Sequence, residues 1–217
     1  MTVVKICGLR TTAHALTAAE AGADLLGFIF APARRRISVA DAAQITAAVR
    51  ASLYSTQIRF VGVFVNETPA EMRAIASHCG LDMLQLSGDE PAAIVDQLGG
   101  IPLLKAVRLN GTPDEAVWLA AANEQVRLLV DAHVAGSYGG AGIVGDWGAA
   151  AELARQQPIL LAGGLHPANV AAAITAVSPW GVDVSSGVET DGVKDSAKIQ
   201  AFIAAVRAVA TTSTPGV

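Results

Sequence analysis

The chain has 217 residues, a length that suits one domain and allows roughly 70% of the unfolded surface to be buried. Hydrophobic residues make up 52% of it and charged residues only 16%, which excludes disorder as the main state. The formal net charge of -4 argues against nucleic acid or an anionic membrane as the main partner.

Cysteine usage and the N-terminus predict a cytoplasmic protein. Cys7 and Cys79 are too few for a disulfide framework and lack metal-ligand spacing, so reduced thiols in a cytosol are expected. The first eight residues lack the basic leader and long apolar stretch of a signal peptide. The most apolar window, residues 158–177, contains two prolines and a Gly-Gly pair, so no membrane span is expected.

Short apolar runs of β type alternate along the chain with Ala-rich segments of helical spacing. Threonine followed by proline marks two helix starts, at Thr68-Pro69 and Thr112-Pro113, and Gly22 and Gly80 mark two helix ends. In chain order, each expected strand is followed by its helix: Val3–Cys7 and 12–22, Leu25–Phe30 and 39–51, Arg59–Val65 and 69–79, Met83–Leu86 and 90–98, Leu103–Val107 and 113–123, Val126–Asp131 and 147–155, Ile159–Leu161 and 167–176, Val182–Val184 and 195–209.

The strand segments are nearly continuous apolar runs, which is typical of parallel strands covered on both faces. Eight strand–helix cycles predict an α/β fold, a single-domain (β/α)8 TIM barrel over residues 1–210, followed by a flexible tail at 211–217. A doubly wound sheet is the alternative, because periodicity alone does not show whether the sheet closes.

Residues suited to chemistry follow most of the expected strands, where a parallel barrel has its active site. By position alone, Cys7 could also be a small buried residue at a strand end, and Asp131 could be a loop cap. The residues in question are Cys7-Gly8, Arg34–Arg36, Asn66, Gln85, Arg108, Asp131, Gly163-Gly164 and Ser185-Ser186-Gly187.

A series of short motifs, in register with the strand ends, carries a family resemblance. The motifs are Lys5-Ile6-Cys7-Gly8, Gly27-Phe28-Ile29-Phe30, the stretch 60–66, Leu84-Gln85-Leu86, Leu129-Val130-Asp131, Gly139-Gly140, Asp146-Trp147, the stretch 161–165 and the stretch 181–189. Each is weak alone, but together, from about residue 3 to residue 207, the chain resembles the phosphoribosylanthranilate isomerases.

This resemblance implies an Amadori rearrangement in tryptophan biosynthesis. N-(5-phosphoribosyl)anthranilate would become its 1-deoxyribulose isomer, an intramolecular conversion of aldose to ketose. The reaction needs a general acid, a general base and an anchor at each end of the small-molecule substrate. It implies no metal and no organic cofactor.

The resemblance assigns the general base to Cys7 and the general acid to Asp131. A thiolate at Cys7 would take the proton from C2 of the opened sugar, with its pKa lowered by nearby positive charge, and Lys5 lies on the same strand face. Asp131 would protonate the ring oxygen. It must hold its proton near neutral pH, and desolvation by the apolar run 128–130 acts in that direction.

Glycine-rich loops would bind the phosphate. Gly163, Gly164, Ser186 and Gly187 follow the seventh and eighth strands, where barrels of this type often bind phosphate. Gly140 and Gly142 belong to the loop 136–142, which resembles the family's mobile loop. A plain turn is the alternative for any one glycine pair.

An arginine of the second loop would hold the anthranilate carboxylate through its bidentate fork. The family pattern favours Arg36, counted from Pro32, but the loop is about a residue short, so Arg35 remains open. Asp183 resembles a family position near the anthranilate amine and could equally be structural.

Two departures from the family pattern affect the surroundings of the site. Ser87 stands where the family often has histidine, and Ala141 stands where it often has threonine. They concern loop dynamics and substrate affinity. A monomer or a homodimer is compatible with the sequence.

Two other functions remain to be weighed. The related ribosylamine isomerase of histidine biosynthesis usually carries aspartate where this chain has Cys7, and it has two similar halves that are not visible here. A non-catalytic phosphate-binding barrel is disfavoured by the presence of both Cys7 and Asp131.

Overall fold

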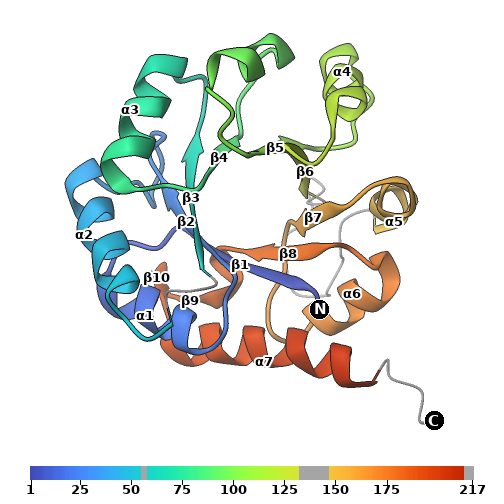
Figure 1. Ribbon diagram of the computed structural model, residues 1–217. Coiled ribbons are helices and arrows are strands. Elements are labelled where there is room, and N and C mark those ends of the chain that lie inside the picture. Colours follow the sequence, from blue (N-terminus) through green and yellow to red (C-terminus); the bar gives the residue numbers. More distant parts are fainter. Residues whose placement is uncertain (55–57, 132–146, 213–217) are drawn as a thin grey trace.

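The computed structural model describes residues 1–54, 58–131 and 147–212, with side chains through residue 209. Within this part of the chain, parallel strands close into a barrel in the order β1 to β8 (Figure 1). β1 pairs with both β2 and β8, so the predicted (β/α)8 barrel is confirmed and the doubly wound sheet is excluded. The strands are β1 Val3–Cys7, β2 Leu25–Ile29, β3 Arg59–Phe64, β4 Met83–Leu86, β5 Leu103–Val107, β6 Val126–Asp131, β7 Ile159–Ala162 and β8 Gly181–Val184.

Helices surround the barrel on its outer side, as Figure 1 shows. The predicted caps are confirmed at α3 and α4, where the Thr68 and Thr112 hydroxyls accept hydrogen bonds from the backbone N–H groups of Glu71 and Glu115. The helical elements are α1 Thr12–Glu20, α2 Val39–Arg50, α3 Pro69–Cys79, η2 Ala92–Gln97, α4 Pro113–Ala121, α5 Trp147–Gln156, α6 Val170–Val177, η3 Ser186–Val188 and α7 Ser196–Thr212.

Several predicted helix boundaries differ from the structure. α6 begins at Val170 rather than at 167, because Asn169 closes a turn by accepting a hydrogen bond from the His166 N–H and donating one to the Gly164 carbonyl. The element after β4 is a short 3-10 helix. α7 runs past the helix end predicted at 209, and residues 213–217 of the predicted tail lie outside the described part of the chain.

A small antiparallel hairpin, β9 Glu189–Thr190 and β10 Val193–Lys194, was not predicted. Its turn holds Asp191 and Gly192, both with positive φ (49° and 79°), which is the geometry of a two-residue primed turn. The Asp-Gly dipeptide is the sequence signal for such a turn, although strands of two residues are too short for periodicity to reveal.

The alternation of side chains along the strands decides which polar residues face the barrel interior. Its apolar layer consists of Leu25, Val61, Met83, Leu104, Leu129, Leu160 and Ala162. Because side chains alternate along a strand, the residues two positions further on point into the same interior at the C-terminal ends of the strands. Gln85 lies two positions after Met83, and Asp131 lies two positions after Leu129, so both side chains point into the interior. None of the described helices is long and apolar enough to cross a membrane.

Candidate active site

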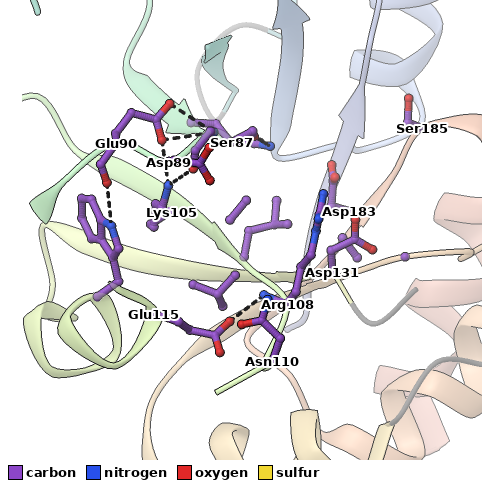
Figure 2. A pocket seen from close by; sticks show the side chains of 18 of the residues that line it. Ser87, Asp89, Glu90, Lys105, Arg108, Asn110, Glu115, Asp131, Asp183 and Ser185 are labelled. Carbon is purple, nitrogen blue, oxygen red and sulfur yellow. Dashed lines mark hydrogen bonds and ion pairs between the residues drawn. The ribbon is translucent and has the colours of Figure 1, made fainter. Parts of the chain in front are cut away.

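A cavity of about 680 Å³ opens at the C-terminal ends of β4 to β8 (Figure 2). The predicted residues Asp131, Asp183, Gly163, Gly164 and Ser186 all line it. Its other wall, from β4, β5 and the loops after them, carries Gln85, Ser87, Lys105, Arg108 and Asn110. Acidic side chains line both sides of the cavity, with Asp131, Asp183 and the glycine loops on one side and Asp89, Glu90 and Glu115 among the polar groups on the other.

Cys7 lies at the end of β1 with 5% of its surface exposed. The Lys5 side chain, from the same strand, is fully buried and ion-paired with Asp183 at 2.9 Å. Gly27 of β2 makes room for both groups, since a Cβ there would lie 3.0 Å from the Cys7 Sγ and 3.2 Å from the Lys5 Nζ. Lys5 thus points into the same interior as Cys7, as strand alternation predicts. Asp183 belongs both to this buried cluster and to the cavity wall.

The electrostatics of this cluster differ from the expectation for Cys7. Burial raises the pKa of the Cys7 thiol above its ordinary value, and this outweighs the charge and hydrogen bond of Lys5, which lower it. The expected lowering of the thiol pKa by nearby positive charge is therefore wrong in its net direction. Burial opposes the charge on Lys5, but Asp183 and Cys7 outweigh it and raise the pKa of the ammonium.

The two candidate arginines of the second loop lie in different places. Arg35 packs against Gly8, where a Cβ would lie 2.8 Å from the Arg35 Cδ, and it interacts electrostatically with Cys7. Arg36 pairs with Ile29 in an isolated bridge and lines a separate cavity of about 340 Å³ between the loops after β2 and β3. Of the two, Arg35 is beside the buried cluster.

The loops after β7 and β8 pack directly on each other. Gly163 and Gly164 adopt positive φ (93° and 65°), a conformation that side chains rarely tolerate. Gly187 in η3 contacts the loop after β7 so closely that any Cβ would collide with the Leu165 carbonyl oxygen. Gly140 and Gly142 lie outside the described residues.

The departure at Ser87 has a local explanation. The Ser87 hydroxyl accepts a hydrogen bond from the Gln85 Nε2 at 3.0 Å, and both residues line the cavity. Serine at this position therefore fixes the orientation of the neighbouring amide. The cavity wall on this side thereby gains a defined polar group.

Two buried ion pairs at the mouth were missed by sequence reasoning. Lys105 pairs with Glu90 at 2.7 Å, beneath Trp118, whose indole N–H donates to the Glu90 carbonyl. Glu189 pairs with Lys194 at 2.9 Å and with Arg35. Apolar periodicity carries no signal for such pairs, because their partners are far apart in sequence or sit on very short strands.

Metal ligation finds no support in the described part of the chain. Among residues 1–54, 58–131 and 147–209, no group of three or more His, Cys, Asp or Glu side chains could hold a metal ion. The absence of a cofactor stays a prediction.

Comparison with known proteins gives the family. The family model described as N-(5'phosphoribosyl)anthranilate (PRA) isomerase matches residues 4–205. The chain belongs to this isomerase family. An N-(5'-phosphoribosyl)anthranilate isomerase of Roseiflexus sp. (strain RS-1) is 59% identical over 209 residues, covering 95% of this chain and 98% of that protein.

Solved isomerase structures agree with the family assignment. Phosphoribosyl anthranilate isomerase from Thermotoga maritima superimposes with a TM-score of 0.83 at 37% identity, covering 96% of this chain and all of that one (100%). Another isomerase structure, in complex with reduced 1-(o-carboxyphenylamino)-1-deoxyribulose 5-phosphate, has a TM-score of 0.80 at 35% identity, with 96% and 100% coverage. The resemblance drawn from the sequence motifs is confirmed.

Proposed function

We propose that the chain catalyses the Amadori rearrangement of N-(5-phosphoribosyl)anthranilate, the aldose–ketose isomerisation of tryptophan biosynthesis. The observation that carries this proposal is the isomerase family match over residues 4–205, nearly the whole barrel. It is supported by the similar isomerase structure whose ligand is the reduced form of the expected product. The grouping of Asp131, Asp183 and the glycine loops around one cavity supports it further.

In the proposed first step, Asp131 donates a proton to the ring oxygen of the ribose. The C1–O bond of the ring breaks, and the anthranilate nitrogen shares its lone pair with C1 to form an iminium. Asp131 suits this role because it lines the cavity at the end of β6, at the edge of the apolar barrel interior. A positioned acid of this kind contributes roughly 10²–10⁴-fold in rate.

In the proposed second step, the Cys7 thiolate takes the proton from C2. The electrons of the C–H bond form a C1=C2 double bond and return the iminium pair to nitrogen. The resulting enol then gains a proton at C1 and loses one from its C2 hydroxyl to give the ketose. Burial raises the pKa of the Cys7 thiol, whereas the positive charges of Lys5 and, to a smaller extent, Lys194 favour the thiolate.

The two ends of the substrate are assigned to separate anchors. The phosphate is proposed to bind at Gly163, Gly164, Ser186 and Gly187, together with Gly140 and Gly142. Backbone N–H groups of tight glycine turns are suited to an anion of this kind. The anthranilate carboxylate is proposed to pair with Arg35 rather than Arg36, because Arg35 interacts with Cys7 while Arg36 lines a different cavity. Asp183 is proposed to lie beside the anthranilate amine.

The test is turnover of freshly prepared substrate, followed by the loss of anthranilate fluorescence. Cys7→Ser and Asp131→Asn are expected to lower kcat/KM by roughly 10²-fold or more each, since each removes one proton transfer. Cys79→Ser is the matched control, because that thiol lies on α3 and donates to the Val39 carbonyl. Folded wild type without turnover would refute the function. Activity unchanged in either site variant would refute that residue's role.

We propose no metal or organic cofactor, because an acid and a base suffice for the proton transfers. A cytoplasmic location is proposed from the two free, buried cysteines. The net charge of -4 supports the absence of a nucleic-acid partner. Whether the protein is a monomer or a homodimer is decided by sedimentation at micromolar concentration.

A further inference from the structure

The β9–β10 hairpin brings two oppositely charged side chains together beside the barrel mouth. Glu189 and Lys194 are cross-strand neighbours in its register, and their side chains form an ion pair at 2.9 Å. Both side chains are buried, with 5% and 4% of their surface exposed. A buried charged pair of this kind needs further partners to satisfy its polar atoms.

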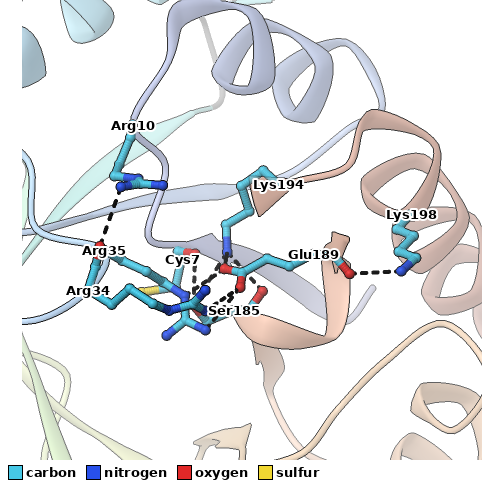
Figure 3. A network of polar contacts seen from close by, with 8 residues as sticks. All are labelled: Cys7, Arg10, Arg34, Arg35, Ser185, Glu189, Lys194 and Lys198. Atoms are coloured by element: carbon cyan, nitrogen blue, oxygen red, sulfur yellow. Dashed lines mark hydrogen bonds and ion pairs between the residues drawn. The ribbon is translucent and has the colours of Figure 1, made fainter. Parts of the chain in front are cut away.

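Those partners come from the loop after β2 (Figure 3). The Arg35 guanidinium donates to Glu189 through Nε at 2.5 Å and through Nη2 at 3.1 Å. Arg34 donates to the same carboxylate at 2.8 Å. The hairpin turn is also close, since a Cβ on Gly192 would collide with the Arg34 guanidinium. The hairpin therefore holds the loop after β2 in place, and this loop carries Arg35, the residue proposed to bind the substrate carboxylate.

The same hairpin is tied to the end of β1. Lys194 donates to the Ser185 carbonyl at 2.8 Å, and the Ser185 hydroxyl donates to the Cys7 carbonyl at 3.2 Å. Figure 3 shows that Cys7, Ser185, Arg35 and Glu189 lie close together. One short element thus joins the strand that carries Cys7 to the loop that carries Arg35.

We propose that Glu189, supported by Lys194, is the positioning residue that holds Arg35 ready for a carboxylate on the substrate's aromatic ring. This inference rests on the proposed function and adds how its carboxylate end is recognised. Two guanidinium N–H directions are occupied by Glu189, which leaves the Nη1 side of the fork for a second carboxylate. Preordering a long side chain removes the entropy that its immobilisation would cost on binding.

The charge balance of the cluster favours an anion despite the glutamate. Arg34, Arg35 and Lys194 supply three positive charges against the one of Glu189. Burial opposes ionisation of Glu189, but Arg35 and Lys194 outweigh it and lower its pKa to about 2. The Glu189 carboxylate is therefore ionised throughout the working pH range, and protonation does not break its ion pairs with Arg35 and Lys194 there.

The experiment compares two ligands on Glu189→Gln and wild type. The first is reduced 1-(o-carboxyphenylamino)-1-deoxyribulose 5-phosphate, and the second is the same compound without its ring carboxylate. We expect Glu189→Gln to raise KM and the Kd of the first ligand about tenfold, with kcat within about threefold of wild type. The Kd of the carboxylate-free ligand should stay within about twofold. Glu152→Gln, which removes an exposed charge paired with Arg155 on α5, is the matched control and should change none of these values.

Equal weakening of both ligands, or of neither, would overturn the proposal. A double variant with Arg35→Gln adds a second criterion. If Glu189 acts through Arg35, then Arg35→Gln alone and the double variant bind the carboxylate ligand equally. Should Glu189→Gln fail to fold, Glu189→Asp keeps the charge but is one methylene shorter, and it must show the same selective loss. If the wild-type protein neither turns over the substrate nor binds the first ligand, the proposed function itself is refuted. If the wild-type protein is active but Glu189→Gln binds both ligands as wild type does, only the positioning role of Glu189 is refuted.

Discussion

Lys5 is buried completely, yet its charge is balanced inside the barrel. Its ammonium contacts Asp183 at 2.9 Å, and the missing side chain of Gly27 leaves it space beside the Cys7 thiol. A buried lysine is costly without such a partner. Lys5 therefore supplies a fixed positive charge near the Cys7 thiol, which offsets part of the rise in the thiol pKa that burial and Asp183 cause.

Lys5→Met is expected to raise the pKa of the Cys7 thiol further, because the positive charge that favours the thiolate is lost. In a Cys79→Ser background, the rate of iodoacetamide alkylation against pH reports that pKa for Cys7 alone. The alkylation profile should move to higher pH, and the rate at pH 8 should fall severalfold. A profile that is unchanged or moves to lower pH, in a variant with wild-type circular dichroism, would contradict the role of Lys5.

Strand alternation predicted that Lys5 and Cys7 share a face, and this is correct. The net direction of the thiol pKa could not be predicted, because it depends on how deeply the residue is buried. The choice between Arg35 and Arg36 was open for a similar reason. Loop length alone did not reveal that Arg35 meets Glu189, about 150 residues further along the chain.

The loops after β7 and β8 pack directly on each other, because Gly187 lies against the Leu165 backbone. Gly187→Ala is expected to push these loops apart. Overpacking of this kind costs about 1–3 kcal/mol, which corresponds to a fall in Tm of roughly 2–12 °C for a protein of this size.

The same substitution should also weaken phosphate binding. Inorganic phosphate, measured as a competitive inhibitor of turnover, is expected to lose affinity severalfold in Gly187→Ala. Ala172→Ser is a suitable control, since it adds one atom at an exposed position of α6. Wild-type Tm together with wild-type phosphate inhibition would show that the loops yield without cost.

The short elements mark where prediction from sequence ends. The eight β-strands of the barrel were found because each is an apolar run with a helical segment after it. The β9–β10 hairpin escaped, since two residues per strand give no periodicity and only the Asp191-Gly192 turn signals it. This hairpin carries Glu189, which binds Arg35, and Lys194, which binds Glu189.

At the scale of the whole molecule, the last helix holds the first strand in the barrel. Arg207 of α7 donates to the Thr2 and Gly22 carbonyls, each at 2.6 Å, and to the Asp24 carboxylate at 2.9 Å. Asp24 in turn accepts a hydrogen bond from the Val4 N–H at 2.7 Å. These bonds connect the two ends of the chain where β1 must pair with β8.

Arg207→Met is expected to lower the free energy of unfolding by about 2 kcal/mol, because three charge-assisted hydrogen bonds at a partly exposed site are lost. Scanning calorimetry should show a fall in Tm of roughly 4–8 °C. KM and kcat should stay at wild-type values, since Arg207 lies among residues at the opposite end of the strands from the cavity. A loss of activity without a loss of Tm would contradict this view.

The burial of Cys7 also affects how fast this thiol is oxidised. A thiolate attacks an oxygen of peroxide and breaks the O–O bond, so the reaction requires both the ionised thiol and access to the sulfur. Cys7 is 5% exposed and its pKa is raised by burial, so both conditions are poorly met. We expect sulfenic acid to form more slowly at Cys7 than on free cysteine under the same peroxide, as trapping and mass spectrometry would measure; an equal or faster rate would refute this. A barrel that keeps its reactive sulfur protonated and covered would retain activity through oxidative episodes that disable exposed-thiol enzymes.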